Sequence, residues 1–237
     1  MKIQFIGTGG AFDIEQGNSS ALLNVHEKTI LIDCGYAVYP KLRQLNLVET
    51  IDAVLITHLH DDHVGSLTTL IFHLYFLAGR KTTVLFPDPK MYLILNDFLK
   101  NALIDPKIFV EFEELSTISG AKYWDTFGEH LPKMQTYGYY FQERDTAIAY
   151  SGDIGTTTIV ESLSKPTFEI PKNLTVFHDT SFFAHASAHT YYKHLEPFLT
   201  HLSIIGYHHN PAFIPSDCLL PLIHQFPEYL LDGATSD

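Results

Sequence analysis

The chain has 237 residues, and 46% of them are hydrophobic, which is enough for one large buried core. A net charge of −12, from 15 basic and 27 acidic residues, disfavours a long polyanion as partner, because Lys and Arg neutralise phosphates. Two cysteines cannot form a disulfide framework and favour a reducing compartment. This cysteine usage makes the cytoplasm the expected location. No linker-like tract divides the chain, so we expect a single domain over residues 1–237.

The predicted elements alternate between strands and helices. We expect strands at Lys2–Gly7, Ser20–His26, Thr29–Asp33, Ala53–Thr57, Thr83–Phe86, Lys107–Glu113, Met134–Gln142, Thr146–Ser151, Leu174–His178 and Ser203–Tyr207. We expect helices at Tyr39–Asn46, Val64–Leu77, Met91–Ala102, Thr157–Leu163, Tyr191–Leu199 and Ser216–Phe226. The most apolar stretch, Leu67–Ala78, is too short to cross a membrane, and the first strand is too short for a signal peptide. We therefore expect a soluble protein without a membrane partner.

Potential metal ligands crowd the loop that follows the predicted strand Ala53–Thr57. Within six residues the sequence places three imidazoles and two carboxylates, at His58, His60, Asp61, Asp62 and His63. A borderline divalent ion such as zinc prefers these ligand types, and such crowding is electrostatically unfavourable unless a cation lies between them. A metal site therefore explains the segment better than a chance cluster of surface histidines.

This HxHxDH pattern resembles the signature of the metallo-β-lactamase superfamily. The resemblance implies an α/β (α+β) fold, the four-layer αββα metallo-β-lactamase sandwich of two mixed sheets. It does not define the substrate, because the superfamily includes lactamases, lactonases, thioesterases, nucleases and redox proteins.

Two later segments resemble further motifs of the superfamily. His130 precedes the strand Met134–Gln142, and Asp153 follows the strand Thr146–Ser151. The resemblance implies that His130 is a ligand and that Asp153 bridges two metals. The alternative roles are a solvated loop histidine for His130 and a helix-capping aspartate for Asp153.

The histidine of the fifth motif has two candidates. Thr200-His201 looks like the family dipeptide, but the residues before it make a poor buried strand. Ser203–Tyr207 makes a good strand that ends at His208, and Pro211 then matches the family spacing. We therefore assign His208 as the ligand, with His209 as a substitute.

Together the motifs imply two zinc ions, with manganese as an alternative in assays. The first ion would be held by His58, His60 and His130, the second by Asp62, His63 and His208, and Asp153 would lie between them. Asp62 is thereby placed at the reacting centre. Asp33 in the first motif and Asp61 in the loop are expected to support the site through hydrogen bonds.

A last pair of segments resembles ribonuclease Z. His178-Asp179-Thr180-Ser181 and His185-Ala186-Ser187 look like segments of that family in which a histidine protonates the leaving oxygen. The family spacing favours His185 as general acid, with His189 in reserve. An exposed histidine beside a helix start is the alternative for both.

Only 22 residues separate His130 from Asp153, too few for the RNA-binding arm of transfer RNA processing enzymes. We therefore predict a phosphodiesterase of the ribonuclease Z-like branch that hydrolyses a small nucleotide, a cyclic mononucleotide above others, with metal-activated water and a histidine acid. The alternatives are a tRNA 3′-processing endonuclease, which is ribonuclease Z itself, and a lactone or lactam hydrolase. We expect a homodimer.

Overall fold

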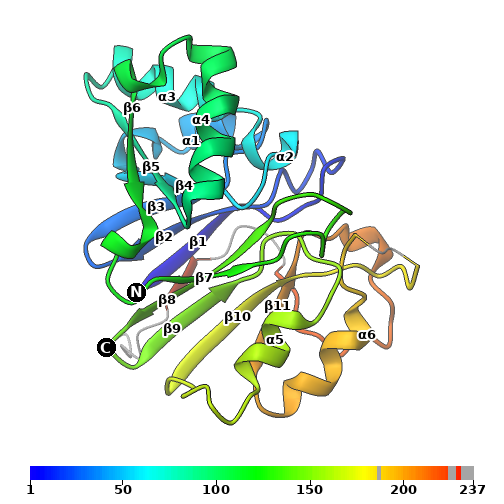
Figure 1. Ribbon diagram of the computed structural model, residues 1–237. Coiled ribbons are helices and arrows are strands. Elements are labelled where there is room, and N and C mark those ends of the chain that lie inside the picture. The colour runs from blue at the N-terminus through cyan, green and yellow to red at the C-terminus, as the bar shows by residue number, and fades with distance from the viewer. Residues whose placement is uncertain (186–187, 224–227, 231–237) are drawn as a thin grey trace, which may run out of the picture.

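The computed structural model describes residues 1–185, 188–223 and 228–230, which form two mixed β-sheets packed face to face with helices on both outer sides (Figure 1). This is the predicted metallo-β-lactamase sandwich, and the fold class is confirmed. None of the helices in the described part of the chain has the length and apolarity that a bilayer crossing requires.

The first sheet has seven strands in the order β12-β1-β2-β3-β4-β5-β6. Neighbouring strands from β12 through β1 and β2 to β3 pair antiparallel, and neighbouring strands from β3 to β6 pair parallel. The bounds are β1 Lys2–Gly7, β2 Ser20–Val25, β3 Lys28–Ile32, β4 Ala53–Leu55, β5 Thr82–Phe86, β6 Val110–Glu114 and β12 Glu228–Leu230.

The second sheet has five strands in the order β11-β10-β9-β8-β7. Strands β9, β10 and β11 are parallel, so their carboxyl ends meet at one edge. The bounds are β7 Lys122–Asp125, β8 Tyr137–Glu143, β9 Thr146–Tyr150, β10 Asn173–Asp179 and β11 Ser203–Tyr207.

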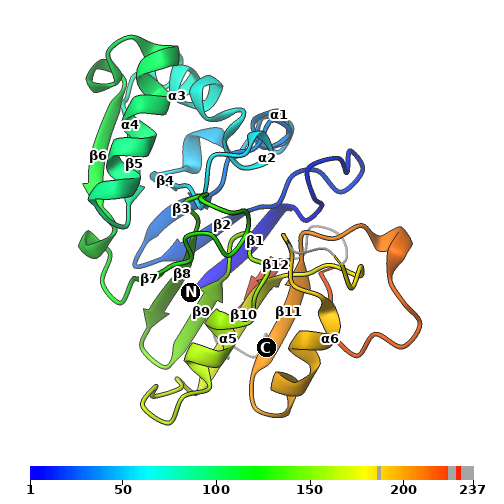
Figure 2. The ribbon, with the colours of Figure 1, turned by 45° about the vertical axis from the view of Figure 1, so that its right-hand side comes forward.

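Helices cover the outer faces of both sheets, as Figures 1 and 2 show. Helices α3 and α4 lie outside the first sheet, and α5 and α6 lie outside the second. The α-helices are α1 Val38–Gln44, α2 Asp61–Val64, α3 Leu67–Phe76, α4 Pro89–Leu103, α5 Thr158–Leu163 and α6 Tyr192–Leu195. The 3-10 helices are η1 Val48–Thr50, η2 Pro106–Ile108, η3 Leu115–Thr117, η4 Glu196–Thr200 and η5 Pro211–Phe213.

Aromatic side chains fill the space between the sheets. The Phe5 ring of β1 lies with its centroid 5.1 Å from that of Phe177, 5.9 Å from Tyr207 and 6.3 Å from Tyr150, all on the second sheet. All four side chains are fully buried. This packing holds the two sheets together directly below the strand ends that carry the candidate ligands.

The predicted helix Ser216–Phe226 is wrong for residues 216–223, and the remainder lies outside the described residues. The backbone here runs beside β11 instead: Gly206 donates to the Pro221 carbonyl at 2.7 Å, and Ile223 donates to the Gly206 carbonyl at 3.0 Å. Pro221 has no amide hydrogen and therefore disfavours a helix interior. The spacing of apolar residues in the segment led to the helix prediction in spite of this proline.

Three other elements differ from prediction. The predicted helix Val64–Leu77 is the shorter α3, and Val64 is the last residue of the preceding turn α2. Between the two helices the hydroxyl of Ser66 donates to the Gly35 carbonyl at 2.5 Å. The predicted helix Tyr191–Leu199 is a single α turn followed by η4, which contains Pro197. The short edge strand β7 had no recognisable sequence pattern.

Candidate metal centre

Asp33 fixes the loop that follows β4. Its Oδ1 accepts from the Thr57 backbone nitrogen at 2.7 Å, and its Oδ2 accepts from Thr57 Oγ1 at 2.9 Å. The same Oδ2 lies 2.8 Å from His63 Nδ1. Asp33 is fully buried, and burial raises the pKa of its carboxyl despite these contacts. Its contacts hold both ends of the loop, as the first motif implied.

The rings of His58, His60 and His130 face one another. His60 Nδ1 lies 3.0 Å from His58 Nε2 and 3.2 Å from His130 Nε2. Two of these rings are held from behind, since Thr57 Oγ1 lies 3.0 Å from His58 Nδ1 and the Ala188 carbonyl lies 2.7 Å from His130 Nδ1. Three ring nitrogens therefore converge on one point.

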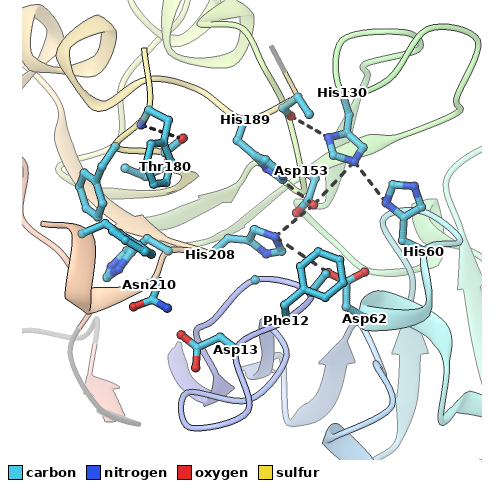
Figure 3. Close-up of a pocket in the computed structure, with 18 of the residues that line it drawn as sticks. Phe12, Asp13, His60, Asp62, His130, Asp153, Thr180, His189, His208 and Asn210 are labelled. Carbon is cyan, nitrogen blue, oxygen red and sulfur yellow. Dashed lines mark hydrogen bonds and ion pairs between the residues drawn. The ribbon is translucent and has the colours of Figure 1, made fainter. Parts of the chain in front are cut away.

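Asp62, His63, Asp153 and His208 form a second group. His63 Nε2 lies 3.4 Å from Asp62 Oδ2 and 3.3 Å from Asp153 Oδ1. His208 Nε2 lies 3.9 Å from Asp62 Oδ2 and 3.4 Å from Asp153 Oδ2 (Figure 3). Four donor side chains from three separate loops therefore surround a second point.

Asp153 lies between the two groups. Its Oδ2 is 3.9 Å from His58 Nε2 and equally 3.9 Å from His130 Nε2. Gly152 permits this position: its φ is +63°, and a Cβ there would meet the Tyr137 carbonyl oxygen at 2.5 Å. The sequence-predicted bridging aspartate thus has the central place in the structure.

Burial controls the charge of the centre. It lowers the pKa of His58 well below its usual range and also lowers the pKa of His60 and of His208. For His63 burial acts in the same direction, but the neighbouring carboxylates, Asp153 first, raise its pKa well above the usual range. Burial would raise the pKa of Asp153, but the surrounding histidines hold it well below its usual range. His58, His60 and His208 are therefore neutral beside ionised carboxylates, and a cation that binds there would displace the proton that the carboxylates hold on His63.

The donor set fits a dinuclear metal centre. His63 Nε2 and Asp153 Oδ1 are buried without a hydrogen-bond partner among the described residues, although they lie 3.3 Å apart. Leaving such atoms unsatisfied costs about 1–3 kcal/mol each, and a coordinated cation would satisfy both. Imidazole and carboxylate are ligands that zinc accepts. These His and Asp clusters are typical of dinuclear metallo-β-lactamase sites.

The centre opens into a cavity of about 670 Å³. His60, Asp62, His130, Asp153 and His208 line one part of it. The volume is that of a small-molecule pocket. The lining continues over loops that follow β1, β10 and β11.

His189 lines the same cavity beside the ligands (Figure 3). Its Nδ1 lies 2.8 Å from Asp179 Oδ2 and 3.9 Å from Asp153 Oδ2. Burial would lower the pKa of His189, but the carboxylates of Asp179 and Asp153 together outweigh it and raise the pKa to about 9. Asp179 is itself fixed, because its Oδ2 also accepts from the Ile154 backbone nitrogen at 2.9 Å.

His185, the first choice for general acid, lies elsewhere. Its side chain is exposed, and it is not among the described residues that line the cavity. The neighbouring residues 186–187 lie outside the described part of the chain. The structure therefore brings the reserve residue, His189, to the centre, and leaves His185 apart from it.

The structure also places the remaining candidate residues, which are His201, His209 and Asp61. His201 is exposed and lies 2.8 Å from Ser164 Oγ through its Nε2, away from the cavity lining. His209 lines the cavity but belongs to neither donor group. Asp61 is exposed at the cavity edge, and its backbone carbonyl accepts from the Tyr36 nitrogen at 3.1 Å. Among the described residues, the Asp61 carboxylate accepts no hydrogen bond from any of the candidate metal ligands.

Two contributors were missing from the sequence prediction. Thr57 touches both Asp33 and His58, and Asp179 holds His189. The acid inside the segment His178-Asp179-Thr180-Ser181 was the available signal for Asp179, but a sequence does not show which histidine an acid faces.

Solved structures confirm the fold. The metallo-β-lactamase fold protein YhfI from Bacillus subtilis superposes with a TM-score of 0.72 at 17% identity, covering 96% of this chain and 98% of that one. Human tRNase Z, short form, gives a TM-score of 0.68 at 15% identity over 98% of this chain and 100% of that one. At these identities the likeness shows the fold alone and does not single out the ribonuclease Z branch.

Curated relatives are closer in sequence. The anti-Pycsar protein Apyc1 of Paenibacillus sp. (strain J14) is 33% identical over 167 residues, which cover 65% of this chain and 67% of the relative. The Apyc1 protein of Bacillus phage BSP38 is 31% identical over 216 residues, covering 78% and 80%. For the Apyc1 protein of Bacillus phage vB_BsuM-Goe3, 35% identical over 125 residues, the match spans about half, 48%, of the relative. The family "Anti-Pycsar protein Apyc1" matches residues 1–217, and the chain belongs to this family.

Proposed function

We propose that the protein is a metal-dependent phosphodiesterase that hydrolyses cyclic mononucleotides. The Apyc1 family is one of metallo-hydrolases that cleave cyclic nucleotide phosphodiesters. The position of His189 carries the proposal, because it places a proton donor beside a two-metal donor set. The ribose oxygen that departs when a cyclic phosphodiester opens is an alkoxide, and such a proton donor lowers the barrier to its departure.

We assign the ligands as the sequence predicted. The first divalent ion would be held by His58, His60 and His130, the second by Asp62, His63 and His208, with Asp153 between them. Two bound ions would supply Lewis-acid chemistry, which lowers the pKa of water and neutralises phosphate charge. Zinc is the proposed metal, with manganese as an alternative.

His189 is the proposed general acid. The Asp179 carboxylate holds the Nδ1 side of the ring at 2.8 Å, which leaves Nε2 as the nitrogen that can donate into the cavity. A proton delivered from Nε2 to the departing ribose oxygen would complete cleavage of the ring. Asp179 acts here as a positioning residue, as the carboxylate partner of a catalytic histidine commonly does.

Two observations favour a small substrate over transfer RNA. The chain between His130 and Asp153 forms the hairpin of β8 and β9, and no additional arm is present among these described residues. Among the described residues that line the cavity, none is Lys or Arg. A polynucleotide would find few partners for its remaining phosphates, because such contacts are made mainly by basic side chains.

A substrate panel tests the proposal directly. Protein purified without chelator should release nucleoside monophosphate from cyclic mononucleotides, while unprocessed tRNA and a lactone should remain uncleaved. Activity on the lactone alone would overturn the substrate class and leave the metal assignment standing.

His189→Ala tests the acid. It should keep both metals but lose about 100-fold to 10,000-fold in kcat on a cyclic nucleotide, with far less loss on bis(p-nitrophenyl) phosphate, whose leaving group needs no proton. His185→Ala is the comparison and should change neither rate. A selective loss in His185→Ala would return the role to His185, and equal loss on both substrates in His189→Ala would show a structural role.

A further inference from the structure

Three exposed phenylalanines gather at the cavity. Phe12 is 96% exposed, Phe183 is 56% exposed and Phe213 is 54% exposed, and all three line the cavity that contains the metal centre. Exposing a large apolar ring to water is unfavourable, and scattered single cases are ordinary. Three such rings around one functional cavity indicate a surface that a ligand covers.

The three rings come from separate segments. Phe183 follows β10, Phe213 ends η5, and Phe12 lies in the loop after β1. The centroids of Phe183 and Phe213 lie 5.2 Å apart with their planes tilted by 60°. Paired aromatic rings of this kind present a face and an edge to a third planar group.

Charge decides what kind of group fits there. The cavity lining described by the structure holds no Lys or Arg, so the negative charge of a ligand can be neutralised only at the metal centre and the adjoining His189. The part of the ligand that covers the phenylalanines is therefore uncharged and apolar on its faces. A nucleobase has this chemistry, and the phosphate attached to it would lie at the metals.

Polar groups stand beside the rings to meet the edge of such a base. Asp13 Oδ1 accepts from the Gln16 backbone nitrogen at 2.9 Å, and Asn210 Oδ1 accepts from the Ala212 nitrogen at 2.9 Å. Each turn fixes one oxygen of the side chain, leaving the other oxygen of Asp13 and the amino group of Asn210 for a ligand. Figure 3 shows both residues on the side of the cavity away from His60.

We infer that Phe12, Phe183 and Phe213 form a nucleobase subsite, in which the base stacks on the face of one ring of the Phe183–Phe213 pair and meets the edge of the other, and Phe12 adds to the apolar lining. The inference rests on the proposed function, since it assigns the metal centre to the phosphate of the same ligand. These residues contribute binding of the base and take no part in bond cleavage.

The double variant Phe183→Ala/Phe213→Ala tests the subsite. Its KM for a cyclic mononucleotide should rise about 5- to 150-fold, the range that loss of stacking with one base gives. Its kcat should stay within a factor of about two, since the rings do not touch the reacting atoms. On methyl p-nitrophenyl phosphate, a phosphodiester without a nucleobase, kcat/KM should fall far less. Phe12→Ala should behave in the same direction with a smaller change.

Phe76→Ala is the matched control, because Phe76 is 66% exposed on α3 and does not line the cavity. It should leave every parameter unchanged. Calorimetric binding of a phosphorothioate cyclic nucleotide, which resists hydrolysis, gives a second measurement, and its Kd should rise in parallel with KM. An unchanged Kd and KM in the double variant would overturn the subsite. If wild-type protein cleaves no phosphodiester but binds this nucleotide through the phenylalanines, the proposed function fails and the subsite stands.

Discussion

Asp33 binds no substrate and belongs to neither donor group, yet it determines how the ligand loop is held. It joins the Thr57 backbone at one end of the loop to His63 at the other. Because the carboxylate holds His63 through Nδ1, the opposite nitrogen is directed at the second group. Partners of this kind orient metal ligands and raise their basicity.

We predict that Asp33→Ala lowers zinc affinity by about 10- to 100-fold, because both Thr57 and His63 lose their partner. Competition with a chromogenic chelator measures this. Asp52→Ala is the control: Asp52 also accepts from a backbone nitrogen, that of Thr29 at 2.7 Å, but on the exposed surface. Equal affinities in the two variants would show that the loop holds itself without Asp33.

Single residues differ in how far their roles could be predicted. The loop ligands were found because His58, His60, Asp62 and His63 lie within six residues that follow a buried strand. The general acid that we propose was not the first choice from the sequence, because His185 and His189 share one loop. Their spacing does not show which of the two side chains turns toward the metal centre. Contact with Asp179 separates them, and that contact exists only after β10 is in place.

At the level of elements, β11 carries the last ligand to its position. The strand is parallel to β10 and ends directly before His208, whose φ is +62° and whose nitrogen donates to the Thr8 carbonyl at 2.9 Å. His201 follows the 3-10 helix η4 on the surface. Strand β11 was predictable from its apolar run. The segment around Pro221 that runs beside β11 was not predictable, because it pairs with the strand through the Pro221 carbonyl oxygen, which a proline keeps although it lacks an amide hydrogen.

His208→Ala should therefore reduce the metal content from about two ions to about one, and should abolish turnover, since a histidine is removed from the second group. Elemental analysis and the cyclic nucleotide assay measure the two effects. His201→Ala removes a histidine at the opposite end of β11 that contacts Ser164 instead, and should change neither. Metal loss in His201→Ala would mean that the fifth motif was assigned to the wrong strand end.

At the level of the whole molecule, the centre joins the two sheets. The loop after β4 belongs to the first sheet, and Asp153 and His208 follow β9 and β11 of the second. The sequence predicted this architecture because the HxHxDH motif resembles that of the metallo-β-lactamase superfamily, and this resemblance implies two sheets packed face to face. The aromatic contacts of Phe5 with the second sheet support the same arrangement below the centre.

Because the ligands come from both sheets, metal binding should stabilise the entire fold, and removal of metal should lower Tm. A site saturated at 100 times its Kd contributes about 2.7 kcal/mol, and each kcal/mol corresponds to about 2–4 °C for a chain of this size. Chelator-treated protein should thus unfold about 5–10 °C earlier per site, and zinc should restore the transition. Asp153→Ala, which lacks the residue between the two groups, should show a much smaller difference between chelated and zinc-loaded samples. If wild-type protein melts at the same temperature with and without chelator, the donor set binds too weakly to join the sheets, and the metal assignment loses its structural basis.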